Sequence, residues 1–259
     1  LISLNPGDGA IYAMVGGFNF YKSKFNRILS AKRQPGSGFK PFIYSAALNQ
    51  GDTLATLVND APIVQDDQSA TNLWRPQNDN MTFNGPTRLR VGLMRSRNLV
   101  SIRLLQQIGI PYAINYIRRF GFTDESLPQS LSLALGSGVM TPMQLARGLA
   151  TFANGGYLIK PFLINKIQND KGQIIFQTTP QRACSLCQPG TIETGSRMGI
   201  PEARAPKILT PQNAYLMNNA LQGVIQSGTG RAAHVLHRRD LAGKTGTTNK
   251  QVDAWFTGY

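Results

Sequence analysis

Three short strings, far apart in the chain, could together carry out acyl transfer through a serine ester. They occupy residues 37–40 (SGFK), 96–98 (SRN) and 244–247 (KTGT). Such a reaction needs a nucleophile, a base that activates it, a donor that protonates the leaving group, and hydrogen-bond donors that stabilise the oxyanion. The strings supply two serine hydroxyls, two amines, an amide and two threonine hydroxyls. All the parts are present if folding gathers the three strings at one place.

Ser37 is predicted at the start of a helix. A Pro-Gly step interrupts the chain just before it, and the apolar run over residues 39–48 is typical of a buried helix that ends near Gly51. A serine in a first helical turn lies among unpaired N–H groups, which favour an oxyanion. Lys40 follows on the same helix face, where its apolar neighbours would desolvate the amine, lower its pKa and make it a general base. Taken alone, the pair could also be an N-capping serine and a solvated lysine.

The second string, Ser96-Arg97-Asn98, is predicted at a break between two helices. Helical periodicity extends over residues 88–95 on one side and 99–108 on the other. Short polar side chains at such a break can point into a cleft. Ser96 could relay a proton to a leaving amine, and Asn98 could hold a substrate amide. The alternative is that both side chains only cap the following helix.

The third string is rich in threonine and glycine and suits a strand of a β-hairpin. Gly246 would let a substrate backbone approach as an added strand. Lys244 would face the cleft as a fixed positive charge that binds a free carboxylate together with the hydroxyls of Thr245 and Thr247. A backbone N–H of this strand could pair with that of Ser37 as an oxyanion hole. The alternative is an ordinary glycine-containing edge strand.

The rest of the chain predicts the elements that must position these strings. Helices opened by proline are predicted over residues 111–120, 142–154 and 211–227. Strand pairs are predicted for residues 1–4 with 10–15, 157–168 with 173–177, and 240–249 with 253–259. Strands near both ends and a helical middle predict an α+β fold, with an antiparallel sheet flanked by helices and an active cleft between the sheet and an all-helical lobe.

In this order the strings resemble the penicillin-binding transpeptidase domain of bifunctional class A penicillin-binding proteins, along nearly the whole chain. The set S-x-x-K, S-x-N and K-T-G belongs to penicillin-binding proteins and, with an S-D-N centre, to class A β-lactamases. Further strings look like family landmarks in family order: 34–41 (QPGSGFKP), 74–78 (WRPQN), 83–86 (FNGP), 133–136 (LALG), 141–142 (TP), 228–231 (GTGR) and 253–256 (DAWF). Jointly these strings make the resemblance specific.

The resemblance implies a serine D,D-transpeptidase that crosslinks peptidoglycan stem peptides through an acyl-enzyme and is inhibited by β-lactams. Ser37 would be the acylated nucleophile, Lys40 its base and Ser96 the proton relay, with the backbone N–H groups of Ser37 and Thr247 as the oxyanion hole. Lys244 would be a further catalytic residue on the carboxylate side. The residues expected to bind substrate are Trp74, Asn98, Thr245, Gly246 and Thr247. Neither a cofactor nor a metal is expected.

The resemblance also bears on what surrounds this chain. Family members carry a membrane anchor and a glycosyltransferase domain upstream, and another strand and helix downstream. We therefore expect a fragment of a longer protein, with one transpeptidase domain of two lobes over residues 1–259 on the periplasmic side of the bacterial inner membrane. The sequence itself contains no run of about 20 apolar residues and no signal peptide at its start.

Other classes of penicillin-recognising protein share the first step, the acylation of the serine. A β-lactamase-type hydrolase needs a base for deacylation, which class A enzymes provide in a Glu-x-x-Leu-Asn setting. Glu125 is followed by SLPQ and lacks that pattern, and Arg97 replaces the aspartate of the β-lactamase centre. A D,D-carboxypeptidase that uses water, and a non-catalytic β-lactam sensor that is acylated but never turns over, remain as alternatives.

Composition excludes some classes of function. With 259 residues, of which 41% are hydrophobic and 15% charged, the chain can bury a full core. The net charge of +14 would attract polyanions. The cations are dispersed through amphipathic segments, however, and no helix-turn-helix, zinc-finger or RNP signature accompanies them, so nucleic acid is not expected as a partner. Peptidoglycan and anionic membrane lipids are the partners that the resemblance implies.

The two cysteines, Cys184 and Cys187, lie in a polar stretch with C-x-x-C spacing. This spacing fits half a zinc site, a redox pair or a local disulfide. There is no second C-x-x-C, and His234 and His237 are not spaced as zinc ligands. In an exported domain, a small loop-closing disulfide of modest stabilising effect is the favoured interpretation.

Overall fold

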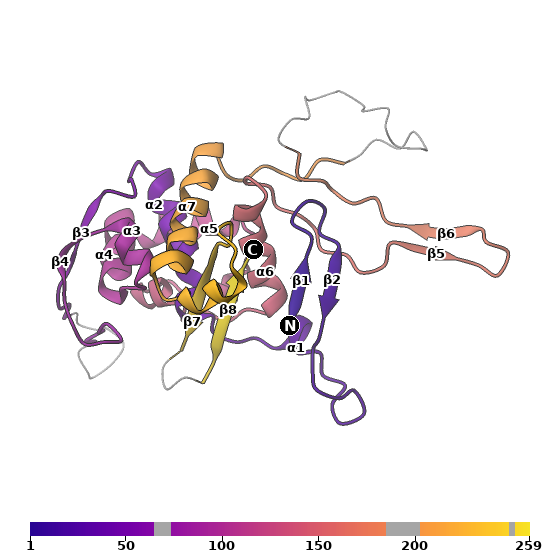
Figure 1. Ribbon diagram of the computed structural model, residues 1–259, viewed down its shortest axis with the longest axis horizontal. Helices are drawn as coiled ribbons and strands as arrows, with labels where there is room; N and C mark the ends of the chain where they lie inside the picture. The colour runs from indigo at the N-terminus through magenta and orange to yellow at the C-terminus, as the bar shows by residue number, and fades with distance from the viewer. Residues whose placement is uncertain (65–73, 185–202, 249–251) are drawn as a thin grey trace. The chain divides into compact units, whose positions relative to one another are not determined.

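The structure is a computed structural model that describes residues 1–64, 74–184, 203–248 and 252–259 (Figure 1). Contacts divide the chain into two compact units. The first unit comprises Leu1–Ala31 and Thr141–Ala214, and the second comprises Lys32–Met140 and Tyr215–Tyr259. All three chemical strings lie in the second unit, so the site is formed within one compact body.

The second unit has a helical core. Its described helices include α2 (Lys40–Asn49), α3 (Leu89–Met94), α4 (Asn98–Ile108) and α5 (Ile110–Arg118). The 3₁₀ turn η1 (Gly36–Phe39) leads into α2, and the turns η2 (Asp124–Ser126) and η3 (Leu131–Leu135) follow α5. The helices α2 and α4 pack directly against each other. Helix α2 begins within one residue of the predicted start and is buried on nearly all sides, in keeping with its largely apolar sequence.

Aromatic rings anchor the first turns of α2. The ring of Phe42 lies 5.0 Å from that of Phe120 and 4.9 Å from that of Phe122, centroid to centroid, and both pairs meet edge to face. Phe39 joins them at 5.3 Å from Phe42 and 5.6 Å from Phe122. Edge-to-face pairs add to the free energy of burying the rings. This cluster therefore fixes α2, and with it the turn that carries Ser37.

Two antiparallel strand pairs complete the second unit. Strand β3 (Leu57–Asp60) pairs with β4 (Gly85–Arg88), and β7 (Gly243–Thr247) pairs with β8 (Ala254–Gly258). The hairpin predicted around the third string is therefore confirmed. The second unit also contains most of α7 (Pro211–Ser227), whose predicted bounds agree with the structure. Helix α7 packs on the end of α3, where Gly223 faces the sulfur of Met94.

The described part of the first unit contains two hairpins, two complete helices and the first residues of α7 (Figure 1). The hairpins and complete helices are β1 (Ile2–Leu4) with β2 (Ile11–Met14), β5 (Lys166–Gln168) with β6 (Ile174–Gln177), α1 (Arg27–Ser30) and α6 (Pro142–Ala153). Helix α6 starts with a capping box in which Thr141 and Gln144 satisfy each other's backbone N–H groups. The hairpin of β5 and β6 is exposed along its whole length.

The predicted α+β fold is confirmed, with corrections in detail. Within the described residues the strands form four separate two-stranded antiparallel sheets. The strand predicted over residues 157–168 is reduced to β5 at its end, because the earlier residues pair with two different segments, in isolated bridges of Tyr157 with Lys207 and of Phe162 with Ala10. None of the described helices combines the length and apolarity that a bilayer span requires.

Of the two cysteines, only Cys184 lies among the described residues. It is disulfide-bonded, in agreement with the favoured interpretation of the C-x-x-C string. Cys187, the other cysteine of the chain, falls outside the described part.

The aromatic cluster makes a direct stability prediction. Replacing Phe42, which is completely buried, with alanine should lower the free energy of unfolding by about 3–5 kcal/mol, because the cavity forfeits three ring contacts. Urea denaturation followed by circular dichroism measures the loss. Phe18→Ala, the same change at a ring that is 99% exposed, should alter stability by less than about 0.5 kcal/mol. Equal losses in the two variants would contradict the assignment of Phe42 to the core.

Candidate active site

Ser37 lies in the 3₁₀ turn η1, directly before α2. Gly36 opens this turn with a φ of +55°, a conformation that glycine adopts without strain. Ser37 is half-buried, and the described residues make no hydrogen bond to its hydroxyl. The predicted location at a helix start is confirmed, and the hydroxyl is left free for an incoming group.

Lys40, the first residue of α2, joins the first string to the second. Its Nζ donates to the Ser96 carbonyl oxygen at 2.7 Å, to Ser96 Oγ at 3.2 Å and to Asn98 Oδ1 at 2.7 Å. The side chain is completely buried. Burial lowers the pKa of Lys40 well below 10.5, and the nearby Lys244 lowers it further, while the carboxylate of Asp79 opposes the shift. Burial and Lys244 both shift Lys40 toward the neutral amine, the form that can accept a proton, which keeps two of the three donor contacts.

Ser96 sits at the break between α3 and α4 in a left-handed conformation, with a φ of +56°. A non-glycine residue there stores strain of about 1–2 kcal/mol, which the surrounding contacts must offset. Its Oγ accepts from Lys244 Nζ at 3.0 Å and from Lys40 at 3.2 Å. Because two amines donate to this oxygen, the hydroxyl proton of Ser96 is available to another acceptor.

Lys244 differs from its predicted orientation. The sequence predicts a fixed positive charge that faces the cleft, but the side chain is completely buried. Besides Ser96, its Nζ donates to the carbonyl oxygen of Thr245 at 3.0 Å. Burial lowers its pKa from 10.5 to about 7, with a smaller opposing contribution from Asp79. The amine of Lys244 thus contacts Ser96, and of the side chains predicted to bind a carboxylate here only those of Thr245 and Thr247 are accessible.

The backbone of β7 touches the turn that carries Ser37. A methyl group on Gly246 would lie 2.3 Å from the carbonyl oxygen of Pro35, and one on Gly36 would lie 2.4 Å from that of Thr247. Both contacts are closer than any side chain allows, so only glycine fits at these two positions. This approach brings the backbone of Thr247 beside η1, where the predicted oxyanion hole requires it.

Asn98 has both ends of its amide engaged. Its Oδ1 accepts from Lys40, and its Nδ2 donates to the carbonyl oxygen of Gln77 at 2.8 Å and to Asp79 Oδ1 at 3.2 Å. A substrate amide would have to share or replace one of these bonds. Trp74 is half-buried, and no described contact joins it to the other predicted site residues.

A buried polar network, which the sequence did not reveal, supports the second string. Asp60, at the end of β3, is completely buried and accepts from Asn78 Nδ2 at 2.7 Å and from the backbone of Asn84 at 3.2 Å. It also pairs with Arg97 at 3.6 Å. Asn78 in turn accepts from the backbone N–H of Asn98 at 2.8 Å. A buried carboxylate with these partners holds the two residues that follow Ser96 in place.

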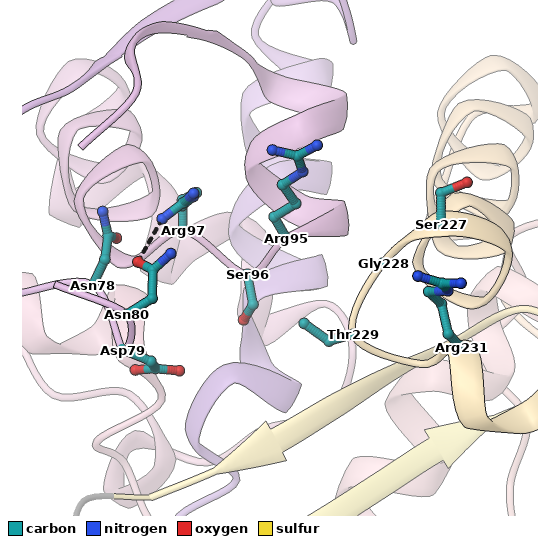
Figure 2. Close-up of a pocket in the computed structure, with 10 residues that line it drawn as sticks. All are labelled: Asn78, Asp79, Asn80, Arg95, Ser96, Arg97, Ser227, Gly228, Thr229 and Arg231. Carbon is teal, nitrogen blue, oxygen red and sulfur yellow. Dashed lines mark hydrogen bonds between the residues drawn. The ribbon is translucent and has the colours of Figure 1, made fainter. Parts of the chain in front are cut away.

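A pocket of about 450 Å³ opens next to Ser96 (Figure 2). The ten residues that line it are Asn78, Asp79, Asn80, Arg95, Ser96, Arg97, Ser227, Gly228, Thr229 and Arg231. Thr229 Oγ1 lies 2.6 Å from Thr245 Oγ1, so the pocket wall is bonded to β7. The predicted strings thus meet around Ser96, and the pocket gives a ligand access to that residue.

Comparison with known proteins identifies the family to which this chain belongs. The profile of the penicillin binding protein transpeptidase domain matches residues 1–259. The chain belongs to the penicillin-binding transpeptidase family. It is 48% identical to penicillin-binding protein 1A of Pseudomonas aeruginosa over 100% of this chain and 35% of that protein. It is 41% identical to penicillin-binding protein 1A of Escherichia coli K12 over 100% of this chain and 36% of that one.

Solved structures agree with the transpeptidase assignment. The crystal structure of penicillin-binding protein 1A from Haemophilus influenzae has a TM-score of 0.90 and 39% identity, and covers 100% of this chain and 41% of that one. The D,D-transpeptidase domain of a peptidoglycan glycosyltransferase from Eggerthella lenta has a TM-score of 0.77 at 21% identity, with 99% and 68% covered, and supports the fold alone. The chain spans about a third of the curated relatives named above.

The contact between β7 and η1 predicts a sharp steric effect. In Gly246→Ala the new methyl group must push β7 away from Pro35, so the rate of acylation by a fluorescent penicillin should fall at least about tenfold, through loss of preorganisation. Stopped-flow fluorescence measures the rate. Gly172→Ala serves as the control: its methyl group meets open space, and the strain of its φ of +76° stays within the exposed hairpin of the first unit, so acylation should be normal. Normal acylation by Gly246→Ala would contradict the described contact.

The burial of Lys244 predicts a pH dependence of stability. The folded-state pKa of about 7 lies below the ordinary 10.5, so the unfolded chain binds more protons between these values. The contribution of this residue to the free energy of unfolding must therefore rise with pH from about 7 to 10.5 and fall on acidification. Urea denaturation at pH 7, 8 and 9 measures the slope. Lys244→Met should flatten it, whereas the exposed Lys166→Met should not. A slope unchanged by Lys244→Met would show that the amine is not buried.

Proposed function

We propose that this chain is a serine D,D-transpeptidase that crosslinks peptidoglycan stem peptides through an acyl-enzyme at Ser37. One observation carries the proposal: the oxygen of Ser96 lies within hydrogen-bonding distance of both Lys40 and Lys244. This geometry joins one residue from each of the three strings. Membership of the penicillin-binding transpeptidase family supports the same reaction class.

The first half of the reaction forms the ester. Neutral Lys40 takes the proton of Ser37, whose oxygen attacks the carbonyl carbon between the two terminal D-alanines. The backbone N–H groups of Ser37 and Thr247 stabilise the oxyanion. As the C–N bond breaks, Ser96 gives its proton to the departing D-alanine nitrogen. Lys40, now an ammonium 3.2 Å away, returns a proton to Ser96, so the protein ends without net proton gain.

The second half reverses the proton path with a new amine. The amine of a neighbouring stem attacks the ester carbonyl, and its proton passes through Ser96 to Lys40. Lys40 then protonates the oxygen of Ser37 as the C–O bond breaks, which leaves a crosslink. A β-lactam resembles the D-alanyl terminus and acylates the same serine, which accounts for inhibition. The substrate-side contacts proposed for this cycle are those of Trp74, Asn98, Thr245, Gly246 and Thr247.

Hydrolysis of the acyl-enzyme is the second candidate reaction. The location of Glu125 disfavours efficient hydrolysis of the β-lactamase type, which needs a base near the ester. Glu125 lies in η2 with a side chain that is 63% exposed, and it pairs with Lys32. A deacylating base needs to reach a water beside the ester, which an exposed surface ion pair does not do. D,D-carboxypeptidation by unassisted water and a non-catalytic sensor role differ from transpeptidation in the fate of the acyl group.

The setting of the reaction is proposed from the relatives. Residues 1–259 would act as one transpeptidase domain within a longer bifunctional protein, because the relatives are about three times as long. The parent protein would be held at the periplasmic side of the bacterial inner membrane by a segment outside this sequence. Its partners would be stem peptides and β-lactams, with no nucleic acid.

Penicillin labelling tests the nucleophile. Ser37→Ala should abolish covalent labelling by a fluorescent penicillin, because no other described hydroxyl shares the Lys40 turn, and its circular dichroism spectrum should be unchanged. Ser30→Ala, an exposed serine in the first unit, should label as the parent protein does. Persistent labelling of Ser37→Ala would show that another residue is the nucleophile. A chase with unlabelled ligand separates the alternatives: rapid loss of label indicates a β-lactamase, and formation of crosslinked peptide singles out the transpeptidase.

A further inference from the structure

The string 253–256 (DAWF) has no role in the proposed reaction. Its first residue, Asp253, leads into β8, which pairs with β7. The backbone N–H of Asp253 donates to Thr248 Oγ1 at 2.9 Å, and its carbonyl oxygen accepts from the N–H of Thr248 at 3.0 Å. These two bonds fix the chain directly after Thr247, whose N–H is one of the two proposed oxyanion donors.

The side chain of Asp253 reaches the segment that precedes Ser37. Its Oδ1 accepts from Arg33 Nε at 2.7 Å, and the Asp253 side chain is only 17% exposed. A charge-assisted hydrogen bond with one mostly buried partner is stronger than an ion pair that is exposed on both sides. Asp253 therefore joins two segments that lie 220 residues apart in the sequence.

Arg33 is itself held from another side. Its backbone exchanges two hydrogen bonds with Met140, at 2.9 and 3.0 Å. One residue further along the chain, Gln34 Nε2 donates to the carbonyl oxygen of Ser137 at 3.0 Å. The segment that leads into η1 is thus fixed to the chain that follows η3, and Asp253 pairs with a residue whose position is already set.

Trp255 adds a second bond between the same two segments. Its Nε1 donates to the carbonyl oxygen of Gln34 at 3.1 Å. Trp255 lies opposite Gly246 in the pairing of β7 and β8, and directly opposite residues share one face of a hairpin. This is the face on which Gly246 approaches the carbonyl oxygen of Pro35. The side chains of β8 therefore hold β7 against the segment before η1.

We propose that Arg33 and Asp253 are positioning residues for the oxyanion hole and act on it through the backbone without touching the substrate. The inference rests on the proposed function. Two N–H groups on separate segments, that of Ser37 in η1 and that of Thr247 in β7, must converge on the oxygen that becomes negative. Neither segment alone sets the separation of these donors. The bond between Arg33 and Asp253 sets it, because it joins the chain just before Ser37 to the chain just after Thr247.

The test uses Arg33→Gln, Asp253→Asn and the double variant. The matched control is the same set of changes at Arg118 and Asp124, an ion pair of equal length, 2.7 Å, in the same unit, whose side chains are 50% and 81% exposed. Saturation kinetics with a fluorescent penicillin separate the affinity of the initial complex from the rate of acylation. An arylboronic acid, which forms a reversible tetrahedral adduct with a nucleophilic serine, measures stabilisation of the oxyanion. Urea denaturation checks that each variant is folded.

Each single substitution in the pair should slow acylation about tenfold or more, because misplaced donors lose preorganisation, and should leave the affinity of the initial complex unchanged. Affinity for the boronic acid should fall by a similar factor. The double variant should be no slower than the single ones, since the two side chains act through one bond. The control variants should match the parent protein in all three quantities.

Two results would overturn the inference while the proposed function stands. One is parent-like acylation in Arg33→Gln and Asp253→Asn. The other is slower acylation with an unchanged affinity for the boronic acid, or with losses that simply add in the double variant. A parent protein that is not acylated, or whose Ser37→Ala variant is still labelled, would instead show that the proposed function fails, and the inference with it.

Discussion

Two buried amines meet at one serine oxygen, and the rest of the site depends on that contact. Lys40 and Lys244 are both completely buried, and both donate to Ser96 Oγ. Two charged ammonium groups so close together and out of water would repel each other strongly, so burial favours the neutral form of at least one. For Lys40, the proposed base, burial and the nearby Lys244 lower the pKa well below 10.5. The same packing leaves the Ser96 proton free to move.

Holding that contact in place requires close backbone approaches and a buried carboxylate. Gly36 and Gly246 let η1 and β7 touch, which ties the turn carrying Ser37 to the strand carrying Lys244. Asp60 anchors Arg97 and, through Asn78, the backbone around Asn98. This network fixes Arg97 and Asn98, the two residues that follow Ser96, and so helps to maintain the strained φ of Ser96. Preorganisation of this kind costs stability locally and supplies the geometry that acyl transfer needs.

Local sequence signals predicted the start of α2, the break before α4 and the hairpin of β7 and β8. Each of these features depends mainly on residues that are close together in the sequence. The side-chain directions could not be predicted, since they depend on contacts between distant residues. The spacing of Lys244 did not indicate that it points inward to Ser96. Asp60 gave no signal, because an aspartate at a strand end usually faces solvent. Thr229 lay within a recognised string, but only its bond to Thr245 gives it a role.

The most direct test of this account is the titration of Lys40 itself. Nuclear magnetic resonance of protein labelled with ¹³C at lysine Cε, with Lys40→Arg used to assign the signal, reports the charge of that amine as pH rises. The account predicts a Lys40 resonance that titrates well below 10.5, separate from the exposed lysines. A Lys40 signal that titrates together with the exposed lysines would show that the amine is charged at neutral pH, and the proposed base would be lost.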